Sequence, residues 1–199
     1  MKSILGHFNY IFDTDYQKCD MYVDLPDKKI TDEGLKLISK IKFDKLTRLN
    51  LKNNNIKEIG SLEKLNFNEL KYLYLNKNNI INVSVFNKIN LNQLESLNLS
   101  HNKIKDISVL DKANFYFLKY LYLNHNNITE IDVLDKLNFF MLIELNLSNN
   151  KIRDIKVFDK INFYQFDHLD LTNNNINFSE IKNIDIIFNL LRKDYIVDI

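Results

Sequence analysis

The chain has 199 residues, of which 45% are hydrophobic, and its 27 lysines and arginines nearly balance 26 aspartates and glutamates. This composition supplies enough apolar surface for a folded core, which argues against a disordered chain, and it lacks the strong positive field that attracts nucleic acid or an anionic membrane. With three glycines and one proline, the chain has no stretch typical of a flexible linker, so we expect residues 1–199 to form a single domain.

The N-terminal segment, residues 1–22, has neither the pattern of a signal peptide nor that of a membrane span. His7, Asn9 and Asp13 interrupt its apolar residues, and no stretch of the chain approaches the roughly 18 apolar residues of a membrane-spanning helix. Cys19 is the only cysteine, which excludes an internal disulfide and favours a reducing compartment. We therefore expect a cytoplasmic protein with no membrane partner, in which residues 1–22 cap one end of the fold.

A 24-residue repeat organises residues 46–178. Each copy begins with the pattern L-x-x-L-x-L-x-x-N-x-I, and the copies start at Leu46, Leu70, Leu94, Leu118, Leu142 and Phe166. A weaker copy covers residues 23–45, where the apolar residues between Thr31 and Ile41 have helical spacing. We expect this copy to be a divergent first repeat that contains a helix.

The alternation of leucines within each copy predicts a short strand with one face buried. One such unit cannot bury its apolar face alone, so the copies should stack at about 4.8 Å per strand into a continuous parallel sheet. A phenylalanine that recurs later in the repeat, as at Phe115 and Phe139, predicts a buried aromatic column on the other side of the stack.

An asparagine recurs where each predicted strand ends. An amide side chain both donates and accepts hydrogen bonds, so it can satisfy backbone groups of its own turn and of the neighbouring turn. We predict a structural ladder of these residues: Asn54, Asn78, Asn102, Asn126, Asn150 and Asn174.

These in-phase copies resemble the leucine-rich repeat family over residues 23–178. The resemblance implies a right-handed α/β solenoid, or horseshoe, with a concave parallel sheet of about seven strands, an irregular or short-helical convex side, and a function in protein recognition. Within the family, the short cysteine-poor chain is similar to intracellular adaptors and regulatory subunits, and to bacterial effector modules.

The repeat pattern ends at residue 178, and apolar residues with helical spacing follow Ser179. Serine is a favoured N-cap residue, so residues 179–199 are predicted to form a capping helix, with Ser179 as its cap, and a tail.

The third, fifth, seventh and eighth residues of each repeat should point to the concave side or its rim. Tyrosine pairs in the second and fourth regular repeats flank a furrow of small polar residues in the third, while Arg48, Lys52 and Lys77 precede the acidic Glu144 and Asp170 along the sheet. The predicted partner-binding residues are Arg48, Tyr72, Tyr74, Ser96, Asn98, His101, Tyr120, Tyr122, His125, Glu144, His168 and Asp170. The alternative explanation of the tyrosine pattern is duplication of a 48-residue unit, with tyrosine simply suited to exposed strands.

Catalytic and metal-binding patterns are weak. His101 and His125 occupy the same position in adjacent repeats without a third metal ligand, and Ser100 beside them is the only arrangement that suggests a nucleophile and a base. We therefore expect no catalytic residue, metal or cofactor, and a monomeric, non-enzymatic module that binds a partner protein on its concave sheet. The alternative is a structural spacer or assembly unit that associates through its convex face or its ends.

Overall fold

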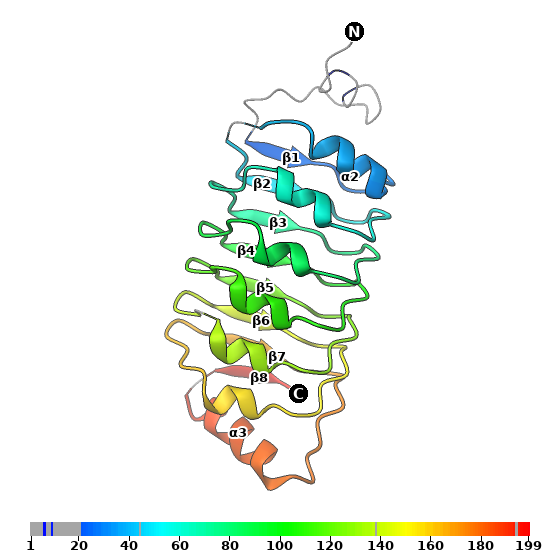
Figure 1. Cartoon of the computed structure of the whole chain (residues 1–199). Helices are drawn as coiled ribbons and strands as arrows, with labels where there is room; N and C mark the ends of the chain where they lie inside the picture. Colours follow the sequence, from blue (N-terminus) through cyan, green and yellow to red (C-terminus); the bar gives the residue numbers. More distant parts are fainter. Residues whose placement is uncertain (1–5, 7–8, 10–20, 44, 138, 194) are drawn as a thin grey trace.

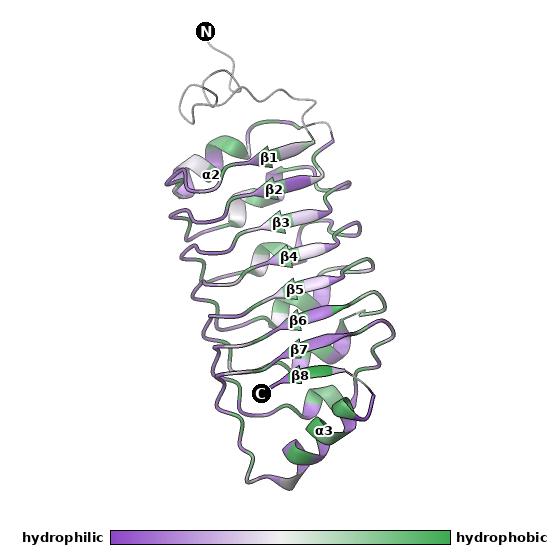
Figure 2. Ribbon diagram, turned by 180° about the vertical axis from the view of Figure 1, so that it is seen from behind, coloured by the Kyte–Doolittle hydropathy of each residue, from purple (hydrophilic) through white to green (hydrophobic). Residues whose placement is uncertain are grey.

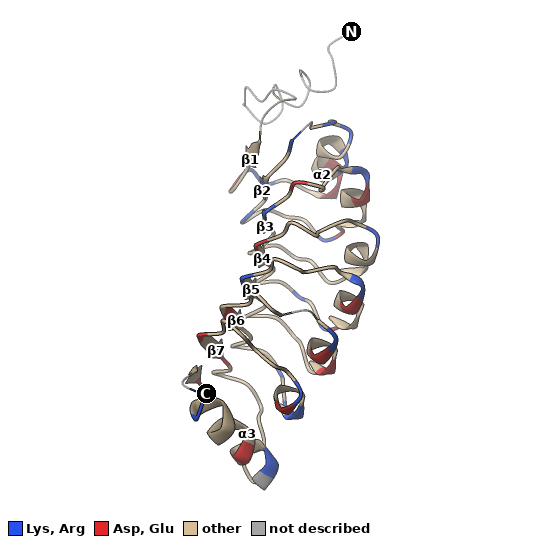
Figure 3. Ribbon diagram, turned by 90° about the vertical axis from the view of Figure 1, so that its left-hand side faces the viewer, with Lys and Arg blue, Asp and Glu red and all other residues tan. Residues whose placement is uncertain are grey.

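The chain forms a gently curved stack of similar turns, with the sheet on the concave side and short helices on the convex side (Figures 1 and 3). The computed structural model describes residues 6, 9, 21–43, 45–137, 139–193 and 195–199. The predicted N-terminal cap, residues 1–22, therefore lies almost wholly outside the described residues. In the described part of the chain, no helix has both the length and the apolar character needed to cross a bilayer.

Eight three-residue strands form one parallel sheet and follow one another in chain order. They are β1 (Tyr22–Asp24), β2 (Arg48–Asn50), β3 (Tyr72–Tyr74), β4 (Ser96–Asn98), β5 (Tyr120–Tyr122), β6 (Glu144–Asn146), β7 (His168–Asp170) and β8 (Ile196–Asp198). Leucine is the fully buried middle residue of β2 to β7, as the alternation predicts, because successive strand residues point to opposite faces. The predicted solenoid is confirmed, and the C-terminal tail adds β8 to the expected seven strands.

Short helices cover the convex side. The first repeat contains α2 (Asp32–Ile38), which buries Leu35 and Ile38. The later turns contain the 3-10 helices η1 (Gly60–Lys64), η2 (Ser84–Asn87), η3 (Ser108–Lys112), η4 (Asp132–Lys136) and η5 (Lys156–Asp159). Phe115 and Phe139, which follow η3 and η4 in the chain, are buried in the core. The ring centroids of Phe139 and Phe163 are 6.2 Å apart.

The asparagines of the ladder join each turn to the turn before it. Asn102 accepts a hydrogen bond from the Ile80 N–H at 2.9 Å, and its Nδ2 donates to the carbonyls of Leu75 and Leu99 at 3.0 Å each. Equivalent bonds are made by Asn54, Asn78, Asn126, Asn150 and Asn174. These bonds satisfy backbone groups at the edge of the core, most of which are buried.

The residue before each ladder asparagine adopts the left-handed conformation, with φ between 53° and 56°. These residues are Asn53, Lys77, His101, His125, Asn149 and Asn173. Asparagine and histidine are among the residue types that adopt this region most readily, whereas lysine adopts it less often. The ladder bonds on the following residue hold the tight turn that requires it.

The last turn contains α3 (Ile181–Leu191), which precedes β8. The prediction that Ser179 caps this helix is wrong: Glu180 is the N-cap, and no side chain makes a capping hydrogen bond. The Ser179 N–H instead bonds the side-chain oxygen of Asn177, which holds the preceding turn and lets the helix begin later.

Candidate functional site

The concave face presents two rows of side chains, one on each side of the buried strand leucines. The first row contains Arg48, Tyr72, Ser96, Tyr120, Glu144 and His168, and the second contains Asn50, Tyr74, Asn98, Tyr122, Asn146 and Asp170. Strand pairing without any shift of register places successive members of a row side by side. All members except Ser96 are half-buried, so the rows form an accessible surface.

The two tyrosine pairs lie on β3 and β5, with β4 between them. Ring centroids are 6.4 Å apart in the pair Tyr72 and Tyr74, and 6.5 Å apart in the pair Tyr120 and Tyr122. Because neighbouring strands are about 4.8 Å apart, the two pairs stand about 10 Å from each other across the sheet.

Tyr122 differs from the other three tyrosines of these pairs because its hydroxyl bonds a side chain of the neighbouring strand. The hydroxyl donates a hydrogen bond to the Glu144 carboxylate at 3.0 Å. Burial, followed by this hydrogen bond and the negative charge of Glu144, raises the pKa of Tyr122 well above its usual range. The ring therefore stays neutral and has a fixed orientation.

The furrow between the tyrosine pairs exposes less of its polar residues than the sequence suggests. Ser96, flanked in register by Tyr72 and Tyr120, is only 5% exposed and offers little surface for contact. Asn98 is the accessible residue of this strand, and its Oδ1 accepts hydrogen bonds from the backbone N–H and the hydroxyl of Ser100. Among the described residues, the Asn98 Nδ2 has no protein acceptor, so it is an available donor between the rings.

His101 and His125 lie on the turns that follow β4 and β5. Their rings stack with centroids 4.0 Å apart and planes 13° from parallel. Burial, with the positive charges of His125 and Lys77, lowers the pKa of His101. The Ser100 hydroxyl donates to Asn98 and not to either histidine, so the possible arrangement of nucleophile and base is not formed. Within the described ranges, no group of three His, Cys, Asp or Glu side chains could hold a metal ion.

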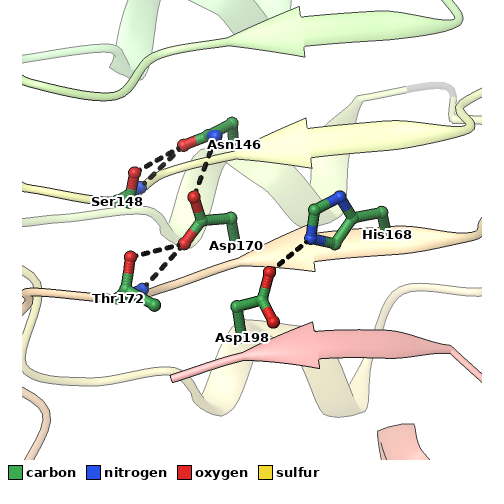
Figure 4. Close-up of polar contacts among 6 residues, drawn as sticks. All are labelled: Asn146, Ser148, His168, Asp170, Thr172 and Asp198. Carbon is green, nitrogen blue, oxygen red and sulfur yellow. Dashed lines mark hydrogen bonds and ion pairs between the residues drawn. The ribbon is translucent and has the colours of Figure 1, made fainter.

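Internal contacts engage the acidic groups at the C-terminal end of the concave face (Figure 4). Asp170 accepts hydrogen bonds from the Thr172 hydroxyl at 2.7 Å and from Asn146 Nδ2 at 2.9 Å. His168 Nε2 lies 2.7 Å from the carboxylate of Asp198. These contacts order the side chains and leave part of each carboxylate facing solvent.

Arg48 lies at the opposite end of the face and is surrounded by residues of β1 and β3. Its guanidinium carbon is 5.0 Å from the ring centroid of Tyr22 and 5.5 Å from that of Tyr72, and one of its nitrogens is 3.8 Å from Asp24. Sequence reasoning missed Tyr22 and Asp24 as members of the face. The match of Val23 with the strand leucines was the available signal, because it places its neighbours in the two rows.

A second network that sequence reasoning missed lies at the start of the strands. Glu95 lies between Lys71 and Lys119, with nitrogen–oxygen distances of 3.3 and 2.9 Å. The hydrogen bond from Lys119 lowers the pKa of Glu95 although burial opposes it. The spacing of 24 residues between these charges was the signal for it, because equivalent residues are neighbours in the stack.

A stack of parallel strands joined by an asparagine ladder defines a repeat solenoid, and the leucine pattern specifies its class. A family model described as leucine-rich repeats (2 copies) matches residues 68–112, 92–136 and 117–160. Residues 68–160 therefore belong to the leucine-rich repeat family. No curated protein sequence matches it.

Solved structures with a similar fold come from distant proteins. Internalin C2 from Listeria monocytogenes is 21% identical with a TM-score of 0.54, and the match covers 88% of this chain and 86% of that one. A second internalin of that bacterium, inlF, is 19% identical with a TM-score of 0.53, over 88% of this chain and 64% of its own. The plant peptide hormone receptor RGFR1, in complex with RGF2, is 15% identical with a TM-score of 0.53, over 76% of this chain and 28% of the receptor. At these identities the likeness shows the fold alone.

Proposed function

We propose that this chain is a non-enzymatic interaction module that binds a partner protein on its concave face, with four tyrosines as anchors: Tyr72, Tyr74, Tyr120 and Tyr122. The paired tyrosines on both sides of β4 are the observation that carries this proposal. The fold does not require them, because other repeats hold arginine, serine, glutamate or histidine at the first of these positions and asparagine or aspartate at the second. Tyrosine is enriched among the residues that contribute most of the binding energy at protein interfaces, and its ring offers a large apolar surface with a polar hydroxyl.

The chemistry of the face indicates the kind of group that would bind there. In the described part of the chain, the hydroxyls of Tyr72, Tyr74 and Tyr120 make no hydrogen bond to protein, and neither does Asn98 Nδ2. A partner would place an apolar side chain between the rings and direct a carbonyl or carboxylate oxygen toward the Asn98 donor. The hydroxyl of Tyr122 is engaged with Glu144, so its ring alone would supply contact area.

The distribution of charge would orient the partner. Arg48 and the exposed Lys52 and Lys77 lie toward the N-terminal strands, whereas Glu144 and Asp170 lie toward the C-terminal strands. A partner with the opposite gradient would be favoured in one direction along the sheet. The receptor RGFR1, which has a similar fold, is known in complex with RGF2, which is consistent with recognition of a polypeptide.

The convex side offers weaker anchors. A depression of about 530 Å³ between η3 and η4 is lined mainly by residues of both charges, including Lys112 and Asp135. Figure 3 shows positive and negative residues side by side on these turns, and Lys112 lies 3.3 Å from Asp111. Exposed ion pairs of this kind contribute little binding energy.

We also propose a cytoplasmic location, on the basis of the single cysteine.

The test compares single variants against a partner captured from native cells with the unmodified chain. Tyr74→Ala and Tyr122→Ala should each weaken its affinity by about 1 to 3 kcal/mol, because each removes buried contact area. Tyr164→Ala is the matched control, since Tyr164 is an exposed tyrosine outside the concave rows. Unchanged affinity in both concave variants, or a loss that the control reproduces, would overturn the proposal.

A further inference from the structure

The last strand of the sheet has an open edge. β8 bonds β7 through the Ile196 N–H, which donates to the Asp167 carbonyl, and through the Asp198 carbonyl, which accepts from the Leu171 N–H, both at 2.7 Å. Alternate residues of a strand direct their backbone groups to opposite edges, so the N–H and C=O of Val197 point away from β7. Among the described residues, no strand pairs with this outer edge.

The side chains of this edge are apolar on the face that continues the core. Val197 is paired in register with the buried Leu169, and Tyr195 and Val197 are both partly buried against the core. Ile199 shares their side of the strand by alternation and is 56% exposed. Natural sheets protect such edges with charged residues or proline, and none stands at these three positions.

The helix beside this strand presents a second apolar surface. Ile184, Phe188 and Leu191 are spaced by four and three residues, which places them on one side of α3, and all three are exposed. Ile186 and Leu190 are buried on its other side. Figure 2 shows the hydrophobic colour on both β8 and α3 at this end of the stack. Apolar surface therefore continues from the strand edge onto the helix.

We propose that this end of the solenoid, formed by the outer edge of β8 and the exposed side of α3, binds a second copy of the chain. The two copies pair their β8 strands antiparallel about a two-fold axis perpendicular to the sheet at Val197. This inference goes beyond the concave site and replaces the expectation of a monomer.

The edge is complementary to itself in this arrangement. Val197 of one copy lies opposite Val197 of the other, and the two residues exchange two backbone hydrogen bonds. Tyr195 lies opposite Ile199 of the second copy, so apolar side chains meet on the core side. A two-fold axis perpendicular to the sheet keeps both concave faces on one side and both α3 helices on the other. The helices then run antiparallel, which brings the exposed Asp185 of one copy toward the exposed Arg192 end of the other.

Molar mass as a function of protein concentration tests the proposal, by sedimentation or by light scattering. The unmodified chain should reach twice its monomer mass at high concentration. Phe188→Ser should raise the dimer dissociation constant at least about tenfold, because the ring is buried twice across the axis. Phe140→Ser is its matched control, since the two residues are 53% and 56% exposed and Phe140 lies on a different turn. Monomer at every concentration, or equal effects of both variants, would overturn the proposal.

A second pair of variants keeps the test independent of the fold of α3. Ile199→Lys should weaken the dimer, whereas Ile81→Lys, at a residue 54% exposed in the second regular repeat, should not. In a Cys19→Ser background, Val197→Cys should form a covalent dimer on mild oxidation, because directly paired strand residues lie within disulfide reach. A dimer without this crosslink would refute the strand pairing. Tyr122→Ala should leave dimer formation unchanged, so failure of the concave site and failure of this end are distinguishable.

Discussion

Replacing Asn102 with alanine perturbs the ladder at its centre. The side chain is 8% exposed, and its Oδ1 is the acceptor for the N–H of the fully buried Ile80 at 2.9 Å. Its Nδ2 donates to the carbonyls of Leu75 and Leu99. It also donates to the carbonyl of Ser100 at 3.2 Å. The substitution therefore removes hydrogen bonds from four backbone groups at once.

The four groups are not affected equally. The Leu75 carbonyl keeps a bond from Asn78, and the Leu99 carbonyl keeps one from Asn126, because each of these carbonyls accepts from two members of the ladder. The Ser100 carbonyl keeps a bond from the Lys77 N–H. Only the Ile80 N–H is left without its acceptor, which costs about 1 to 3 kcal/mol for a buried group. Each of the three weakened carbonyls adds about 0.5 kcal/mol, toward the lower limit for a net hydrogen bond, so we expect a loss of about 2.5 to 4.5 kcal/mol in the free energy of unfolding.

Urea denaturation followed by circular dichroism measures this loss. Asn114→Ala is the control, because Asn114 is an exposed asparagine of the convex side, and it should change stability by less than about 0.5 kcal/mol. An Asn102→Ala chain that loses less than about 1 kcal/mol would refute the argument, because the buried N–H would then have no energetic need of the amide.

Three further predictions concern titration and metals. The pKa of His101 is lowered from its ordinary value of 6.5, so the folded chain resists protonation of this residue. The contribution of His101 to the free energy of unfolding should be complete above about pH 6.5 and should fall as the pH drops below that value. His101→Asn should reduce this fall in urea titrations at several pH values. Tyr122→Phe removes the bond to Glu144, so it should cost about 1 kcal/mol and abolish the phenol that ionises at the highest pH in an absorbance titration. Zinc should leave the melting temperature unchanged, and a saturable rise that His101→Ala abolishes would contradict this.

Periodicity was sufficient to predict the sheet, because a leucine such as Leu97 and an asparagine such as Asn102 recur at fixed spacing and each has one structural use. Equivalent residues are neighbours in a solenoid, so the two rows of the concave face follow from the same spacing. The prediction was less complete where the pattern ends. Residues 196–198 have no repeat signature, and their parallel pairing depends on contacts with β7 that local sequence does not encode.

Other features depend on tertiary neighbours. The burial of Ser96 reflects the large side chains beside it in register, although serine itself suits an exposed strand. The left-handed turn residues include Lys77, a residue type that does not predict that conformation. The late start of α3 results from the turn at Asn177, which uses the Ser179 N–H before the helix begins.

The position of the partner on the fold is tested most directly by site-specific photo-crosslinking. A photo-reactive amino acid replaces Asn98, between the tyrosine pairs, or Asn114, exposed on the convex side, and each chain is illuminated with the captured partner. The concave-site account predicts a covalent product from position 98 and none from position 114. Crosslinking from position 114 alone, with affinity unchanged when all four concave tyrosines are replaced by alanine, would contradict it.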